Sequence, residues 1–189
     1  STFTNLVAGD TNGVADIFLH NRTSKMTERV SIGPSGLEAD GASGNPGLSA
    51  DGRYVVFESM ATNLVGPGND VNGASDIFVH DRTTGSTVLV SKNQAGLAGN
   101  WHSFTPSISR DGKWIAFWSV ADNLVDNDTN GVADVFVVDW QSATPTMRRV
   151  SVSASGTEAN GDSRVPVLTR DGRYVVFESE ASNLLDGGG

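Results

Sequence analysis

The sequence predicts an all-β protein, a β-propeller of four-stranded antiparallel blades, and three observations support this prediction. Short segments recur at a long, regular period: Asp-Gly stands at residues 51, 111 and 171 of the 189. Val, Ile and Phe gather in short runs, which favours strands. No segment shows the periodicity of an amphipathic helix. A fixed long period indicates repeated units that bury their apolar faces by stacking on one another.

The middle unit shows how each strand is predicted. Residues 48–59 contain two strand-forming runs on either side of an Asp-Gly pair, a signal typical of a tight hairpin. Both alternating sets of side chains in the second run are apolar, so we expect a strand covered on both faces. A long loop, residues 60–75, leads to a third strand at 76–81, and a Thr-Gly turn leads to a fourth at 87–91. A second long loop, residues 92–103, enters the next unit.

The repeats do not start and stop at blade boundaries. We expect a half blade at residues 1–46, whole blades at 47–105 and 106–165, and a second half blade at 166–189. The first half supplies only third and fourth strands, and the last supplies only first and second strands. One chain therefore holds three blades' worth of strands, fewer than the roughly four to eight of a closed propeller. Two hypotheses stay open: two chains associate head to tail into a six-bladed homodimer, or the chain is a fragment of a longer propeller.

The composition narrows the range of partners. The net charge is -9 and the isoelectric point is about 4.6, so the chain lacks the clustered Lys and Arg that a nucleic-acid backbone requires. There is no cysteine, which excludes disulfides and thiolate metal sites. No apolar run approaches the length of a membrane-spanning helix. We therefore expect no nucleic-acid partner and no membrane span.

An Asp/Asn/Gly motif occurs in three of the long loops and is the strongest candidate site. Its third copy matches the start of a calcium-binding loop, in which alternate oxygens converge on one cation and a glycine permits a sharp turn. There Asp126, Asp128, Asn130 and Asp134 would donate side-chain oxygens, and Val132 its carbonyl oxygen. The first two copies lack the leading Asp. They keep the candidate ligands Asp10, Asn12 and Asp16, and Asp70, Asn72 and Asp76.

Calcium is the predicted ion, because it accepts about six to eight oxygen ligands in flexible geometry. The third loop is expected to bind it best, since its motif is the most complete. No Glu follows where an EF-hand supplies its bidentate ligand, so binding should be weak. An alternative stays open for all three loops: Asn-Gly is a preferred turn, and Asp side chains cap such turns without a metal.

Topology predicts a ligand face. In an antiparallel four-stranded blade, the loops after the second and fourth strands leave on the same side, away from the tight turns. Binding residues concentrate on long loops held by a rigid scaffold. Trp101-His102 is the strongest candidate on this face. For the other candidates the alternative explanation is that they are ordinary polar loop residues exposed to solvent. The candidates, all in loops that enter a first strand, are Glu38, Asp40, Asn100, Trp101, His102, Glu158 and Asn160.

A longer pattern links the units to a known family. Residues 46–57, 106–117 and 166–177 each carry Pro, then Ser or Thr, then Asp-Gly, a basic residue, an aromatic residue, two small or aliphatic residues and Phe. This pattern resembles the TolB-like repeats, also called WD40-like or PD40 repeats, over nearly the whole chain. The resemblance implies a β-propeller, usually of six blades. It implies little about function, because such propellers serve as binding platforms and as accessory domains of peptidases.

The sequence carries no nucleophile elbow and no phosphate-binding glycine loop. We therefore expect a non-catalytic, exported propeller module that binds a protein or a carbohydrate, with calcium holding its loops. The alternative is the propeller part of a glycosidase or peptidase with its catalytic residues outside this chain; Glu38 and Glu158 are the one carboxylate pair to consider. A purely structural array is the third hypothesis. The resemblance and the acidic, cysteine-free composition imply an extracellular or periplasmic location in a bacterium.

Overall fold

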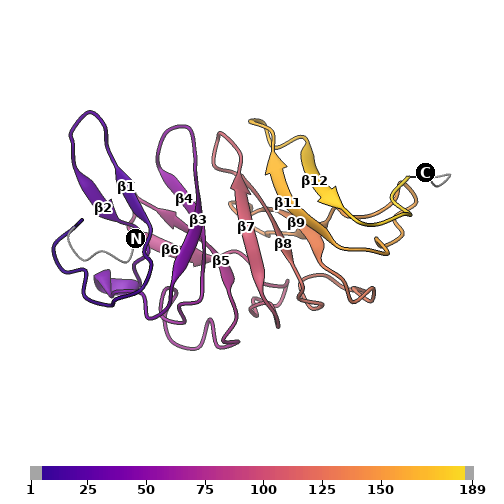
Figure 1. The fold of residues 1–189 in the computed structure, drawn as a ribbon, viewed down its shortest axis with the longest axis horizontal. Coiled ribbons are helices and arrows are strands. Elements are labelled where there is room, and N and C mark those ends of the chain that lie inside the picture. The colour runs from indigo at the N-terminus through magenta and orange to yellow at the C-terminus, as the bar shows by residue number, and fades with distance from the viewer. Residues whose placement is uncertain (1–5, 186–189) are drawn as a thin grey trace.

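The computed structural model describes residues 6–185 and arranges them as four antiparallel sheets standing side by side (Figure 1). Two of the sheets have four strands and two have only two strands. The prediction of an all-β fold with two whole blades and two half blades is confirmed. The described residues contain no helix that is long and apolar enough to cross a membrane.

The described strands follow the predicted order. Each whole blade runs up and down, with every strand hydrogen-bonded to its sequence neighbour, as in a propeller blade. Within residues 6–185, a single 3₁₀ turn, η1 (Pro34–Gly36), interrupts the β structure. The strands of the first half blade and first whole blade are β1 (Phe18–His20), β2 (Thr27–Arg29), β3 (Ser43–Leu48), β4 (Tyr54–Ser59), β5 (Asp76–Asp81) and β6 (Ser86–Leu89). Those of the second whole blade and last half blade are β7 (Ser103–Ile108), β8 (Trp114–Ser119), β9 (Asp134–Asp139), β10 (Met147–Arg149), β11 (Ser163–Leu168) and β12 (Val175–Ser179).

The Asp-Gly hairpins form as predicted. Between β3 and β4, Asp51 accepts hydrogen bonds from the Ser49 hydroxyl (2.6 Å) and from the backbone N–H of Arg53 (3.0 Å). Gly52 has a φ of 72°, in the left-handed region that disfavours residues with a Cβ. The turn therefore needs this Asp and this Gly for separate physical reasons.

Apolar layers between neighbouring sheets form the core. On β4, Val55 and Phe57 pack toward the first half blade, whereas Tyr54 and Val56 pack toward the second whole blade. Phe57 is fully buried and stacks on Phe78 of β5, with ring centroids 6.0 Å apart. The prediction that the second strand is covered on both faces is confirmed.

The first strand of each blade begins earlier than the sequence predicts. β3 begins at Ser43, and the predicted blade boundary before residue 47 lies inside it; the boundaries before residues 106 and 166 likewise lie inside β7 and β11. The cause is a bulge: the register between β3 and β4 shifts between Gly44 and Gly47. Pro46 sits in this bulge, where its missing N–H interrupts no regular ladder. The proline is thus accommodated within the strand.

The last half blade leaves an apolar face uncovered. Tyr174 and Val176 of β12 are 59% and 67% exposed, whereas the equivalent Tyr54 and Val56 are buried against the next blade. Val167 of β11 is exposed on the same half blade. The outermost parts of the two predicted half blades, residues 1–5 and 186–189, lie outside the described residues.

Candidate functional site

The two kinds of connection lie on opposite sides of the molecule. In Figure 1 the tight turns that join β1 to β2, β3 to β4 and β7 to β8 point to the top, and the long loops gather at the bottom. The first strands of the blades, β3, β7 and β11, run next to one another across the middle of this view. Such strands line the channel of a closed propeller. The ends of these strands at the long loops therefore correspond in position to the ligand face predicted from the sequence.

In the third unit, the Asp/Asn/Gly loop folds around an arginine. Nη1 of Arg149, at the end of β10, lies 2.8 Å from Asp128 Oδ1, 3.3 Å from Asp134 Oδ2 and 2.7 Å from Glu158 Oε1. Thr129 donates to Glu158 through its backbone N–H (2.9 Å) and its hydroxyl (2.6 Å). One largely buried guanidinium thus bridges three carboxylates. Its positive charge offsets the free-energy cost of burying their negative charge.

The first unit repeats this arrangement around Arg29. Its Nη1 lies 3.3 Å from Asp10 Oδ1, 3.7 Å from Asp16 Oδ2 and 2.6 Å from Glu38 Oε1. Hydrogen bonds from Thr11, and then from Arg29, lower the pKa of Glu38 to about 2. The carboxylate of Glu38 is therefore ionised at neutral pH and held by three donor groups, two from Thr11 and one from Arg29.

Asp128 shows the opposing effect of burial. Its side chain is only 4% exposed, and desolvation raises its pKa to about 6, while the Arg149 guanidinium acts in the opposite direction. In the same network, hydrogen bonds from Thr129 lower the pKa of Glu158. The network therefore contains one carboxylate held ionised by donors and one close to protonation, with Arg149 as the counter-charge.

Three of the predicted calcium ligands of the third loop lie together, but beside an arginine. Asp128 and Asp134 lie beside Arg149, and Asn130 donates through Nδ2 to Asp134 Oδ2 (2.7 Å). Asp126, the predicted leading ligand, is exposed to solvent. In residues 6–185, no three His, Cys, Asp or Glu side chains form a group that could hold a metal ion. Calcium binding by this loop stays a prediction, and the guanidinium already supplies positive charge there.

Most of the predicted ligand-face residues tie neighbouring loops together. Asp40 accepts hydrogen bonds from the backbone N–H and the hydroxyl of Thr62, at 2.8 Å each. Asn100 exchanges hydrogen bonds with Asp122, and Asn160 makes the corresponding contacts in the last unit. Glu38 and Glu158 belong to the two arginine networks. These side chains therefore join the loop that enters a first strand to the loops beside it.

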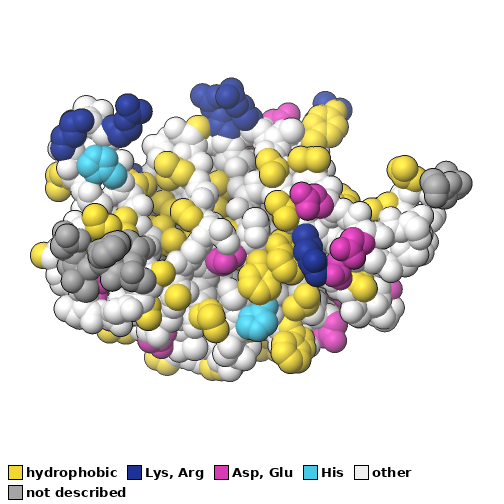
Figure 2. Space-filling view, in the orientation of Figure 1, with side chains coloured by type: hydrophobic (Ala, Val, Ile, Leu, Met, Phe, Trp, Pro, Cys, Tyr) yellow, Lys and Arg dark blue, Asp and Glu magenta, His cyan; other side chains and the backbone are white. Residues whose placement is uncertain are grey.

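An aromatic cluster, of which the sequence predicted only His102, lies at the loop end of β7 and β8. The rings of His102 and Phe104 stack with centroids 5.6 Å apart, and those of Phe104 and Trp118 lie 4.6 Å apart. Arg164 of β11 places its guanidinium carbon 5.4 Å from the centroid of the Trp118 ring. Figure 2 shows hydrophobic side chains reaching the surface over β7, beside Lys or Arg and Asp or Glu side chains. We call His102, Phe104 and Trp118 the channel cluster.

Hydrogen bonds fix the orientation of the channel cluster. Nδ1 of His102 accepts the backbone N–H of Ser75 (2.8 Å), so this nitrogen carries no proton. Nε1 of Trp118 donates to the hydroxyl of Thr105 (3.3 Å), and Glu58 accepts the backbone N–H of Thr105 (2.8 Å). All three rings remain partly exposed. The cluster thus combines open ring faces with fixed polar neighbours, the combination that small ligand sites use.

The repeats themselves contained the signal for this cluster. Positions 44, 104 and 164 carry Gly, Phe and Arg, and positions 58, 118 and 178 carry Glu, Trp and Glu. The adjacent positions, such as Ser43, Ser103 and Ser163, are constant. Variation at a pair of facing positions beside constant ones indicates residues that the blade itself does not require.

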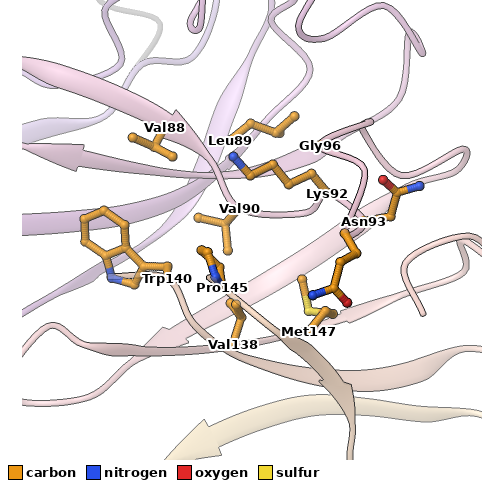
Figure 3. Close-up of a pocket in the computed structure, with 11 residues that line it drawn as sticks. Val88, Leu89, Val90, Lys92, Asn93, Gly96, Val138, Trp140, Pro145 and Met147 are labelled. Carbon is orange, nitrogen blue, oxygen red and sulfur yellow. The ribbon is translucent and has the colours of Figure 1, made fainter. Parts of the chain in front are cut away.

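A second concavity lies between the two whole blades (Figure 3). It is a groove of about 210 Å³, with Lys92 and Asn93 at one end. Nε1 of Trp140 is already bonded to the carbonyl of Gly112 (2.7 Å). The groove therefore offers mainly apolar surface and few free polar groups for recognition. Its apolar lining consists of Val88, Leu89, Val90, Val138, Trp140, Pro145 and Met147.

No family model and no curated protein matches the sequence. Solved structures do match the fold. The chain is similar to TolB from Acinetobacter baumannii, with 16% identity and a TM-score of 0.50, over 92% of this chain and 36% of that one. It is also similar to a structure from a study of two prolyl endopeptidases, with 14% identity and a TM-score of 0.50, over 87% of this chain and 22% of that one.

These matches extend over much less than the whole of the other proteins. The chain spans 36% of TolB and 22% of the prolyl endopeptidase, in keeping with a part of a propeller. At such low identity the likeness shows the fold and leaves activity open. The chain therefore has a TolB-like β-propeller fold, of which it supplies two whole blades and two half blades.

Proposed function

We propose that the protein is a non-catalytic propeller module, exported from a bacterial cell, that binds a ligand at the channel cluster. The observation that supports this proposal is a set of partly exposed rings flanked by Glu58 and Arg164, at the loop end of the inner strands. A carbohydrate fits this chemistry best. The C–H faces of a sugar ring pack on aromatic faces, and a carboxylate and a guanidinium orient its hydroxyl groups. A protein segment with an aromatic or charged side chain is the second class of ligand.

The ligand is tested with variants of two tryptophans. Trp118→Ala removes the largest ring of the channel cluster, and we expect it to weaken oligosaccharide binding by about tenfold or more, because buried aromatic anchors dominate binding energy. Trp140→Phe, in the groove between the blades, is the control and should bind as the wild type does. Binding is measured by calorimetry against a panel of neutral and acidic oligosaccharides. Equal affinities of the two variants, or no binding in the panel, would contradict a carbohydrate site here.

We further propose that a second copy of the chain closes the ring, since three blades' worth of strands from each copy would give six blades. The whole blades supply the register: Phe57 lies opposite Phe78, and the next blade repeats this pair. Phe177 of β12 and Phe18 of β1 occupy the same repeat positions in the two half blades. Pairing β12 of one copy with β1 of the next would place Phe177 opposite Phe18 and cover both sheet edges.

The packing between blades supports the same association. A Cβ at Gly112 would lie only 2.3 Å from Cδ2 of Tyr54, so the aromatic ring of one blade covers the turn glycine of the next, and the following pair of blades repeats this contact. The first turn glycine, Gly52, has no such ring within 4 Å. Tyr174, the last aromatic in the series, is exposed. Head-to-tail association would place Tyr174 of one copy on Gly52 of the other.

Engineered cysteines test this ring. Leu19→Cys and Val176→Cys would face each other across the new strand pair, as Val79 and Val56 do within a blade. Directly opposed cysteines on paired strands come close enough for a disulfide to form. The chain has no other cysteine. We expect a dimer mass by light scattering and a covalent dimer on oxidation. The pair Leu19→Cys and Tyr174→Cys is out of register and should crosslink far less. A monomer that does not crosslink would contradict closure by a second copy.

A further inference from the structure

The three Asp/Asn/Gly loops are not equivalent. In the first and third units, an arginine lies between the two Asp side chains of the loop, and a Glu held by a Thr completes the network. In the middle unit the three positions are Val71, Leu89 and Ala98 in place of Thr, Arg and Glu. The two Asp side chains, Asp70 and Asp76, are retained. The middle unit has therefore lost the whole internal counter-charge together with the groups that orient it, and has kept the carboxylates.

This loss leaves charge in the protein interior. Asp70 is 3% exposed, and its Oδ1 has no hydrogen-bond partner. Asp76 is fully buried; its two oxygens accept hydrogen bonds from the Ser91 hydroxyl (2.5 Å) and from Asn72 Nδ2 (2.6 Å). The charges that act on these carboxylates are negative as well: Asp40 raises the pKa of Asp70, and Asp70 raises the pKa of Asp76. Buried carboxylates without a counter-ion are costly, so either a proton or a cation from outside the chain has to neutralise them.

We propose that the middle unit binds one hard cation, with calcium as the preferred ion, between Asp70 and Asp76, where the sister units hold a guanidinium. Asp70 Oδ1 is the free ligand oxygen, and Asp76 supplies a second carboxylate. The carbonyl oxygen of Gly99 lies in the same cluster, 2.5 Å from the Asn72 amide nitrogen. Water completes the ligand set, as it commonly does for calcium. This inference does not depend on the proposed ligand site. Of the three Asp/Asn/Gly loops that the sequence offers as calcium sites, it selects the middle one.

In this proposal, the arginine guanidinium of the first and third units and the bound cation of the middle unit serve the same structural purpose: each neutralises two buried Asp side chains. Leu89 is 5% exposed and belongs to the apolar layer between the first half blade and the first whole blade, so it cannot neutralise the carboxylates. In the sister units the cation is covalently part of the chain. In the middle unit it would be exchangeable, which makes the stability of this one blade responsive to the cation concentration.

Thermal unfolding after chelator treatment, followed by calcium titration at constant ionic strength, tests the proposal. At calcium concentrations about a hundredfold above Kd, we expect a rise in Tm of roughly 5–10 °C for the wild type. Asp70→Asn should abolish this rise. Asp128→Asn, which alters the equivalent position in the third unit, is the matched control: it should lower the starting Tm, because Arg149 loses a partner, and should keep the calcium response.

A second variant keeps the test decisive if Asp70→Asn folds poorly. Val71→Thr, Leu89→Arg and Ala98→Glu together rebuild the sister network in the middle unit, and we expect this triple variant to be insensitive to calcium. Loss of the calcium response in either variant, with the response kept in Asp128→Asn, supports the site. An unchanged Tm of the wild type with and without calcium would overturn it. A full response in Asp70→Asn would also overturn it, since the ion would then bind elsewhere.

Discussion

Replacing Arg149 by Leu is expected to lower the free energy of unfolding by about 3–5 kcal/mol, the usual cost of removing one partner from a buried ion pair. The variant leaves Asp128, Asp134 and Glu158 without the guanidinium that now lies within 3.3 Å of each of them. The side chain of Arg149 is only 9% exposed, so water compensates little. Urea unfolding at neutral pH measures the change. Arg148→Leu, at the adjacent exposed position, is the control and should change stability by less than about 0.5 kcal/mol.

The same chain shows how the loss can be repaired. The middle unit carries Val, Leu and Ala where the third unit carries Thr129, Arg149 and Glu158. Adding Thr129→Val and Glu158→Ala to Arg149→Leu removes one carboxylate and its donor, and we expect the triple variant to be more stable than Arg149→Leu alone. The recovery should be partial, because two Asp side chains remain buried. If Arg149→Leu destabilised no more than Arg148→Leu, the network would be a surface feature and this account would be wrong.

The repeats made most of the fold predictable from the sequence. Strand alternation and Asp-Gly turns are local signals that recur. β5 begins and ends where a strand at residues 76–81 was predicted, and β4 lies within the hairpin predicted for residues 48–59. The starts of the first strands were missed for a local reason as well. A proline is disfavoured inside a paired strand, but here a bulge removes the need for its N–H. Only the backbone could show that Pro46 lies inside β3.

The site was less predictable, because its partners are distant in sequence. The calcium hypothesis treated the Asp/Asn/Gly loop as a self-contained unit, whereas Arg29 and Arg149 come from the strand that follows the next turn. The sequence did contain a clue: both arginines align with Leu89 in the middle unit. The channel cluster shows the same limitation, since Phe104 and Trp118 become neighbours through strand pairing. The ligand-face prediction relied on where the long loops leave the blade, and loop placement does not report pairs that form between strands.

Stability without calcium is expected to fall as the pH rises from about 4 to about 7. Burial, and then the negative charge of Asp70, raise the pKa of Asp76 from 3.8 to about 7. The folded protein therefore holds a proton that the unfolded chain releases over this range. Because the native protein binds one more proton than the unfolded protein, the free energy of unfolding changes by up to about −1.4 kcal/mol per pH unit. Urea unfolding in chelator across this range measures the slope, and the total loss should reach a few kcal/mol.

Asp76→Asn isolates this contribution. The variant mimics the neutral form at every pH, so its slope should be shallower than that of the wild type by about one proton. Asp128, whose pKa burial raises to about 6, contributes in both proteins and cancels in the comparison. Calcium should also flatten the wild-type profile near neutral pH, because a bound cation and a bound proton compete for the same pair of carboxylates. Identical slopes for the two proteins in chelator would mean that Asp76 is ionised in the fold, and that its charge is balanced by groups other than a proton.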